Sequence, residues 1–256
     1  MQILHSKIVG QGKPLLILHG LLGMGDNWIS LARRYAENGF EVHLIDQRNH
    51  GQSFHSDKMN YQVLSDDLSV YINHYNLKDI LLLGHSMGGK SAMYFAVENP
   101  DKIEKLIIVD IAPKYYPPHH HFIFDAIHSL DLSVGDRKAI EKELDKKINN
   151  KAISLFILKN LKREKFGGFS WKPNISVLEN SLDELGEALP PFSVFDKPTL
   201  FVKGEKSPYI TKSDDGLIKA HFPKVEIISI PNSGHWVHAE QSEIFYDKTL
   251  FFLKNR

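Results

Sequence analysis

The chain of 256 residues contains no cysteine. It therefore cannot form disulfides, use a thiolate as nucleophile or bind a metal through sulfur, and its composition agrees with a reducing compartment. It also has no net charge, because 31 Lys and Arg balance 31 Asp and Glu, so the charge favours neither nucleic acid nor an acidic membrane surface as a partner. No apolar run is long enough to span a bilayer, and the N-terminus lacks a signal-peptide pattern. We therefore expect a cytoplasmic protein.

Apolar runs that alternate with amphipathic segments make up most of the chain. The composition, with 42% hydrophobic and 24% charged residues, is ordinary for a globular protein, and the length allows one α/β domain or a core with an insertion. We predict strands at 3–9, 15–18, 40–45, 80–83, 103–109, 199–203 and 225–230. We predict helices at 27–38, 61–76, 214–221 and 239–253, and another directly after Ser86. This alternation predicts an α/β fold with a mostly parallel central sheet flanked by helices.

The alternation of predicted strands and helices stops after the strand that ends at Val109. From Pro113 to about Pro191 no strand is convincing, and four helical patterns follow one another near 120–131, 136–147, 149–163 and 174–189. An insertion of this kind after a core strand is typical of a lid. We therefore predict a core of residues 1–112 and 192–256 and a helical cap of residues 113–191.

The segment Gly84-His85-Ser86-Met87-Gly88 follows an apolar strand and precedes a helix. It matches the nucleophile-elbow pattern G-x-S-x-G in the context that this pattern requires. Glycine neighbours leave room for a serine with strained backbone angles, and the tight turn exposes its hydroxyl. The alternative is a helix N-cap serine between chance glycines. We interpret Ser86 as a nucleophile.

Two backbone amides are candidates for an oxyanion hole, the group of N–H donors that stabilises a negatively charged oxygen. The amide of Met87 lies at a helix N-terminus, where the helix dipole favours negative charge. The bend His19-Gly20-Leu21-Leu22-Gly23 directly follows a central strand, which makes the amide of Leu21 the second candidate. His19 itself is expected to be a structural histidine that is hydrogen-bonded to the backbone.

A serine nucleophile needs a base, and His235 is the candidate. It lies in a glycine-containing loop after the last core strand and follows the serine in the chain, as the order of this fold requires. His238 is the competitor, but we expect it to begin the final helix and to point elsewhere.

The acid of the triad has two candidates. The usual place for it, after the penultimate strand, reads Gly204-Glu205-Lys206-Ser207, with Ser207 at the expected carboxylate position. Glu205 is nearby but at the wrong phase of the loop. Asp110 ends the strand that follows the elbow helix, at the same sheet edge as Ser86, so it could orient the imidazole of His235. We interpret Asp110 as the acid and Ser207 as a hydrogen-bonding bridge to it.

Two polar clusters have structural interpretations. Asp46 and Arg48 are expected to form an internal pair that braces the loop 46–53. A metal site is suggested by the run His119-His120-His121, with Asp125 four residues after it. No further ligand is evident, however, and we predict no metal.

These motifs together closely resemble the α/β-hydrolase superfamily and, within it, small bacterial esterases of the YbfF type. The similarity covers nearly the whole core. It is carried by His19 to Gly23, Asp46 to Gly51, Gly84 to Lys90, Val109 to Pro113 and Gly234 to His238. The resemblance implies an α/β-hydrolase fold and hydrolysis of carboxylic esters or thioesters without metal or cofactor. It also implies that the aspartate at Asp110 acts as the triad acid, joined by the serine at Ser207.

The sequence therefore predicts an esterase that acts on a small-molecule ester or thioester through an acyl-enzyme on Ser86, with neither nucleic acid nor membrane as a partner. Two other functions stay open. One is an acyl-CoA thioesterase, in which basic cap residues meet the phosphates of the substrate. Those residues are Lys146, Lys147, Lys151, Lys162, Arg163 and Lys165. The other is a ligand-binding protein of the same fold with weak turnover.

Overall fold

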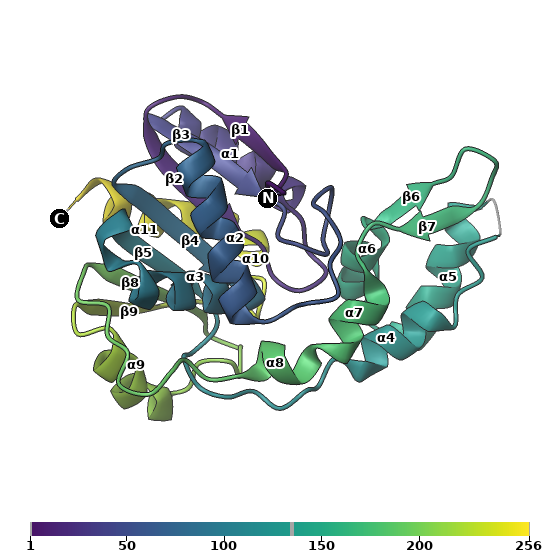
Figure 1. The fold of residues 1–256 in the computed structure, drawn as a ribbon. Helices are drawn as coiled ribbons and strands as arrows, with labels where there is room; N and C mark the ends of the chain where they lie inside the picture. The colour runs from purple at the N-terminus through teal and green to yellow at the C-terminus, as the bar shows by residue number, and fades with distance from the viewer. Residues whose placement is uncertain (1, 134–135, 256) are drawn as a thin grey trace.

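Seven strands form one sheet in the part of the chain that the structure, a computed structural model, describes, which is residues 2–133 and 136–255 (Figure 1). The strands are β1 (Ser6–Val9), β2 (Lys13–Leu18), β3 (Phe40–Ile45), β4 (Ile80–His85), β5 (Ile103–Val109), β8 (Thr199–Gly204) and β9 (Val225–Ile230). Their order is β1-β3-β2-β4-β5-β8-β9. Only the pairing of β1 with β3 is antiparallel, which confirms the mostly parallel sheet.

Helices cover both faces of this sheet. The core helices and 3₁₀ turns are η1 (Gly25–Trp28), α1 (Ile29–Ala36), α2 (Tyr61–His74), α3 (Met87–Glu98), η2 (Pro100–Lys102), η3 (Lys212–Asp214), α9 (Asp215–His221), α10 (Val237–Glu240) and α11 (Ser242–Lys254). Alternate residues of β2 show the two faces: Leu16 packs in a cluster with residues of α2, α3 and α9, and Leu15 in a cluster with residues of α1 and α11. Each central strand is therefore buried on both faces, which explains its continuous apolar run.

The chain between β5 and β8 folds into a separate group of elements beside the sheet (Figure 1). They are α4 (His121–His128), α5 (Arg137–Ile148), α6 (Lys151–Leu158), β6 (Leu161–Arg163), β7 (Phe169–Trp171), α7 (Ile175–Asn180) and α8 (Leu182–Gly186). We call residues 113–191 the insertion. The prediction that it contains no strand is wrong, because β6 and β7 form an antiparallel hairpin. Gly167 and Gly168 reverse the chain there with φ of 100° and 74°, which only glycine adopts readily.

An apolar interior joins the insertion to the core. Leu22 and Met87 of the core belong to the same buried cluster as Phe124, Leu144 and Ile157 of the insertion. The insertion therefore covers the sheet edge at which β2 and β4 end. Within the described residues, no helix has the length and apolar character needed to cross a bilayer.

The two ends of the insertion run side by side as they leave the core. The amide of Tyr116 donates to the carbonyl of Gly186 at 2.8 Å, and the amide of Leu189 donates to the carbonyl of Pro113 at 2.9 Å. We call these paired segments, residues 113–118 and 186–191, the stem. The stem is the double connection through which the insertion is attached to β5 and β8.

Candidate active site

Ser86 occupies the sharp turn between β4 and α3. Its φ of 54° and ψ of −120° lie in the left-handed half of backbone space, which is strained for a side chain with a Cβ. The glycines around it are required, because a Cβ at Gly84 would lie 2.2 Å from the carbonyl oxygen of Gly88, and a Cβ at Gly88 would lie 2.4 Å from that of Leu18. The turn therefore has the geometry of a nucleophile elbow, as the motif predicts.

Asp110 and His235 come together from positions 125 residues apart. Nδ1 of His235 donates to Oδ2 of Asp110 at 2.7 Å. The carboxylate is fully buried, and the imidazole is 16% exposed. Asp110 follows β5 and His235 follows β9, so both lie at the carboxyl edge of the sheet near Ser86. With the proton on Nδ1, the other imidazole nitrogen, Nε2, is left as an acceptor.

Two further donors hold the Asp110 carboxylate. The hydroxyl of Ser207 donates to Oδ2, and the backbone amide of Gly204 donates to Oδ1 at 3.0 Å. Glu205 is exposed, and its Oε2 accepts from the amide of Asn232 at 2.8 Å. The structure thus brings Asp110 and Ser207 to His235 and does not bring Glu205 there.

His235 makes two further contacts, one through its ring and one through its backbone. Its ring stacks on Tyr209 with 4.0 Å between the centroids and 20° between the planes. Nε2 of His85 donates to the carbonyl oxygen of His235 at 2.9 Å. Burial holds the pKa of His85 well below its ordinary value, so this side chain stays neutral at pH 7 and adds no charge beside His235.

The bend after β2 orients the peptide between Gly20 and Leu21. The carbonyl of Gly20 accepts from Nδ1 of His19 at 2.8 Å and from the amide of Gly23 at 2.9 Å. In a trans peptide the N–H points opposite to the C=O, so these two bonds direct the Leu21 amide away from the bend. In the described part of the chain this amide makes no hydrogen bond. The Met87 amide, as the first of α3, has no partner within its helix.

The competing histidines are occupied elsewhere. His19 donates from Nδ1, and its Nε2 accepts from the amide of Gln47 at 3.1 Å, so neither ring nitrogen is available as a base. His238 stacks on Trp28 at 3.9 Å, and burial lowers its pKa to about 3. Both observations agree with the structural role expected of His19 and with the choice of His235 over His238.

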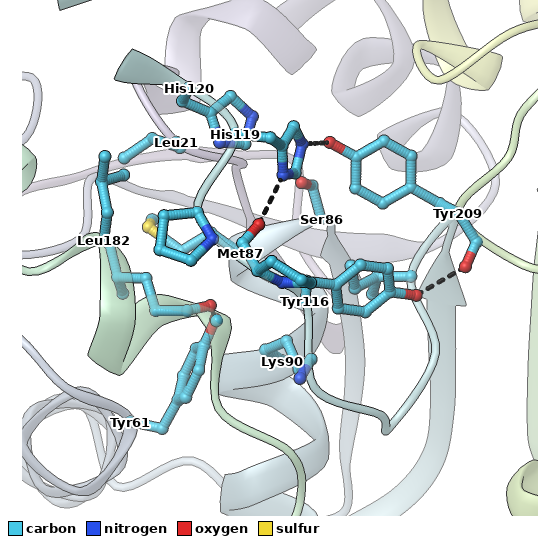
Figure 2. A pocket seen from close by; sticks show the side chains of 15 residues that line it. Leu21, Tyr61, Ser86, Met87, Lys90, Tyr116, His119, His120, Leu182 and Tyr209 are labelled. Atoms are coloured by element: carbon cyan, nitrogen blue, oxygen red, sulfur yellow. Dashed lines mark hydrogen bonds between the residues drawn. The ribbon is translucent and has the colours of Figure 1, made fainter.

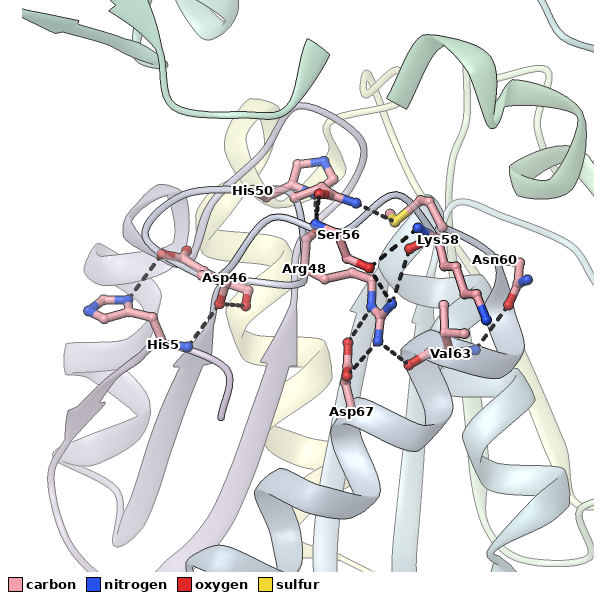
Figure 3. A network of polar contacts seen from close by, with 12 residues as sticks. His5, Asp46, Arg48, His50, Ser56, Lys58, Asn60, Val63 and Asp67 are labelled. Atoms are coloured by element: carbon pink, nitrogen blue, oxygen red, sulfur yellow. Dashed lines mark hydrogen bonds and ion pairs between the residues drawn. The ribbon is translucent and has the colours of Figure 1, made fainter. Parts of the chain in front are cut away.

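Asp46 and Arg48 both brace the loop 46–53, but they do not pair with each other as predicted (Figure 3). Oδ1 of Asp46 accepts from the amide of Gly25 at 2.7 Å, and its Oδ2 contacts Nδ1 of His5 at 3.1 Å. Arg48 pairs instead with Asp67 of α2, with NH2 2.7 Å from Oδ1. The prediction of a mutual pair is wrong, because Asp46 is bound by Gly25 of η1 and by His5 just before β1, and Arg48 is bound by Asp67 of α2.

His119, the first residue of the triple-histidine run, makes two contacts in the wall of the site. Nδ1 donates to the carbonyl of Pro117 at 2.9 Å, and Nε2 accepts from the hydroxyl of Tyr209 at 2.6 Å (Figure 2). Within residues 2–133 and 136–255 no group of three or more potential ligands is positioned to hold a metal ion. His119 therefore lies in the wall of the site without the surroundings of a metal ligand.

Several basic residues of the insertion pair with neighbouring carboxylates. Lys146 lies 2.6 Å from Glu143, and Lys151 lies 2.7 Å from Asp145 and also contacts Glu141. These pairs are exposed and typical of a solvated helix face. The carboxylate partners of Lys146 and Lys151 therefore give no support to a phosphate site at these two lysines.

Ser86 lies where two cavities between core and insertion meet. The larger, of about 230 Å³, also contains His235 and has apolar walls that include Trp28, Phe156 and Trp236. The smaller, of about 50 Å³, is shown in Figure 2 and extends from Ser86 toward Lys90. A carbonyl carbon bound at Ser86 can therefore direct one substituent into each cavity.

Residues outside the sequence motifs also support this site, and the sequence analysis gives them no role there. Tyr209 was not identified, although it follows Ser207 by two residues, and the contact of His85 with His235 was not foreseen. The position of Tyr209 in the loop after β8 was the available signal. The walls supplied by α6 had no sequence signal, because any amphipathic helix offers apolar residues at the same spacing.

Comparison with known proteins adds a second line of observation. Residues 13–138 match a family model described as the alpha/beta hydrolase fold. The chain is 35% identical over 247 residues to a mouse (Mus musculus) protein named sn-1-specific diacylglycerol lipase ABHD11, covering 93% of this chain and 80% of that protein. It is 32% identical over 234 residues to esterase YbfF of Escherichia coli K12, covering 90% of this chain and 89% of that one.

A solved structure, described as a marine microorganism esterase, superposes on this chain with a TM-score of 0.95. The two are 43% identical, and the match covers 98% of this chain and 100% of the other. The similarity extends through the insertion as well as the sheet. The chain therefore belongs to the α/β-hydrolase family, among the esterases of the YbfF type, and is a serine hydrolase of carboxylic esters.

Proposed function

We propose that Ser86 is the nucleophile, His235 the general base and Asp110 the acid that orients it, with Ser207 as a bridge to the carboxylate. The observation that carries the proposal is the 2.7 Å hydrogen bond from His235 to the buried Asp110, beside a cavity that Ser86 and His235 share. The bond keeps the proton on Nδ1 and leaves Nε2 free to accept the proton of the serine.

The reaction proceeds in two halves through an acyl-enzyme. Oγ of Ser86 attacks the ester carbonyl while Nε2 of His235 takes its proton, and the resulting imidazolium returns that proton to the departing alcohol. Water then attacks the acyl-enzyme with the same base, which releases the carboxylic acid and restores Ser86. Among the described residues Oγ of Ser86 makes no hydrogen bond, and we expect it to form one to Nε2 of His235, which lines the same cavity, when substrate binds.

The amides of Leu21 and Met87 are proposed to bind the oxyanion of both tetrahedral intermediates. The Gly20–Leu21 peptide is held in place by His19 and Gly23, so its N–H need not reorient during the reaction. The Met87 amide adds the positive end of α3. Each such donor contributes on the order of 3 kcal/mol to the transition state in serine hydrolases.

We further propose that the insertion, residues 113–191, acts as a cap that selects the substrate. Ile153, Phe156 and Ile157 of α6 line the larger cavity, so its walls favour an apolar acyl or alcohol group. The relative named as a diacylglycerol lipase agrees with apolar esters as the substrate class.

Ser86→Ala tests the proposed nucleophile. We expect at least a thousandfold loss of kcat on p-nitrophenyl acetate, because the covalent step becomes impossible, with an unchanged circular dichroism spectrum. Ser91→Ala is the matched control, since this serine lies on the same helix and its hydroxyl donates only to the carbonyl of Met87 at 3.1 Å. A fluorophosphonate probe should form its adduct on Ser86. Wild-type turnover by Ser86→Ala, or an adduct on another residue, refutes the assignment.

A further inference from the structure

A buried lysine lies one helical turn after the elbow serine. The side chain of Lys90 is on α3, and the residue is only 2% exposed. Its backbone amide donates to the carbonyl of Ser86 at 3.0 Å. The side chain is part of the wall of the smaller cavity, where Figure 2 shows it with Tyr61 and Tyr116. The mechanism proposed above gives this ammonium group no role.

The partners of the ammonium group are the two segments of the stem. Nζ of Lys90 donates to the carbonyl of Lys114 at 2.6 Å, and it also donates to the carbonyl of Glu187. Lys114 lies on the segment that enters the insertion and Glu187 on the segment that leaves it. One side chain on the helix of Ser86 therefore holds both connections of the insertion.

Among residues 2–133 and 136–255 no carboxylate is hydrogen-bonded to Lys90, which is unusual for a buried cation. The rings of Tyr116 and Tyr61 lie 5.3 and 5.9 Å from Nζ and supply weak cation–π attraction. The pKa of Lys90 is lowered to about 7, because the effect of burial outweighs that of the nearby Glu187 carboxylate, which raises it, and the Lys114 ammonium adds to the lowering. Burial raises the pKa of Tyr61 and Tyr116, so both stay neutral near pH 7. The group that changes charge here is therefore Lys90.

The stem is linked in turn to the residues around His235. The hydroxyl of Tyr116 donates to the carbonyl of Tyr209, whose ring stacks on His235 (Figure 2). Pro117 and Gly186 of the stem line the smaller cavity. A stem that moves away from α3 would therefore widen this cavity.

We propose that Lys90 is a positioning residue that fastens both segments of the stem to the helix of Ser86, so that its protonation state sets how tightly the insertion closes over the smaller cavity. A protonated amine makes charge-assisted hydrogen bonds to the two carbonyls, and the neutral amine makes weaker ones. Deprotonation therefore loosens the stem. The kinetic consequences rest on the proposed function of Ser86, whereas the motion of the stem does not.

Lys90→Met tests the inference, because methionine has about the length and the apolar character of the lysine side chain but lacks its N–H donors. Lys105→Met is the matched control. Lys105 is also buried, at 7% exposed, and its Nζ donates to the carbonyls of Phe252 and Leu253 at the end of α11, away from the site. Both variants remove a buried lysine from backbone carbonyls, but only the first releases the stem.

Hydrogen exchange of the Tyr116 and Leu189 amides is the first readout, because these amides close the stem. We expect exchange at least tenfold faster in Lys90→Met and unchanged in Lys105→Met. In the wild type, exchange corrected for its intrinsic pH dependence should accelerate between pH 6 and 8.5. Unchanged exchange in Lys90→Met, or equal acceleration in both variants, overturns the inference. If Lys90→Met fails to fold, the wild-type pH series alone decides, and pH-independent protection overturns it.

The second readout is the division of the effect between KM and kcat. For p-nitrophenyl esters with acyl groups of two to eight carbons, Lys90→Met should raise KM by about fivefold to twentyfold and change kcat by less than threefold. Lys105→Met should change neither. An equal loss of kcat in both variants contradicts the positioning role. A wild-type protein without esterase activity would refute the proposed function instead, and the exchange measurement would still test the stem.

Discussion

Asp110→Asn is the sharpest test of the triad, because the structure dictates how the new amide must lie. Oδ1 of Asp110 accepts from the amide of Gly204, and Oδ2 accepts from His235 and Ser207. If the amide oxygen of the asparagine keeps the bond to Gly204, its NH₂ group faces His235. The opposite orientation places two donors against each other at Gly204, which costs about 1–3 kcal/mol in a buried site.

The favoured orientation has a direct chemical consequence. An NH₂ group facing Nδ1 of His235 makes that nitrogen an acceptor and moves the proton to Nε2. The imidazole then has the wrong tautomer to take the proton of Ser86. For a triad acid we expect a loss of about 10³–10⁴ in kcat, which equals about 4–5.5 kcal/mol in the barrier. KM should change little, because Asp110 is fully buried and does not line either cavity.

Steady-state kinetics on p-nitrophenyl acetate provide the measurement. Glu205→Gln is the matched control, since it makes the same acid-to-amide change on the competing carboxylate, which is exposed and accepts only from Asn232. We expect its kcat within about twofold of the wild type. An Asp110→Asn variant with more than a tenth of wild-type kcat, or a severe loss in Glu205→Gln, would refute the assignment of the acid.

Three smaller perturbations follow from the same contacts. Ser207→Ala removes one donor from Asp110 and should lower kcat about tenfold, the effect of one hydrogen bond to a charged group; an unchanged kcat contradicts the bridging role. Burial lowers the pKa of His238 to about 3, so the folded protein keeps this imidazole neutral. Its contribution to the free energy of unfolding is fully present above pH 6.5 and is lost as the pH falls. Between pH 7 and 5 the free energy of unfolding, measured with urea, should therefore fall by about 2 kcal/mol less in His238→Phe than in the wild type. An equal fall in both proteins would contradict this. Asn160→Ala leaves the carbonyl of Leu22 without its 2.7 Å donor and should destabilise the protein by about 1–3 kcal/mol, measured in the same way; an unchanged midpoint contradicts this.

Much of the core could be predicted from the sequence. The strands at Phe40–Ile45, Ile103–Val109 and Val225–Ile230 agree to the residue, because each is a short run rich in apolar and β-branched residues. The elbow at Ser86 was equally visible, since its glycines are local steric requirements. The position of His235 followed from the rule that loops after parallel strands meet at one sheet edge.

The insertion was harder to predict. The helix expected at 149–163 ends at Leu158, and β6 and β7 have only three residues each. Strands this short carry too few residues for an alternating pattern to stand out from a helical one. The pair Gly167-Gly168 was the available signal, since adjacent glycines favour a chain reversal, and both adopt a positive φ here.

The sequence by itself determined which chemical groups the protein has and where along the chain the core strands lie, because strained turns and buried strands impose local demands on residue type. Only the tertiary structure decided the partners. It brought Asp110 rather than Glu205 to His235, paired Arg48 with Asp67 and placed Lys90 against both segments of the stem. These contacts join residues 19 to 125 positions apart, and their geometry depends on strand order and on the path of the insertion, which no local pattern encodes.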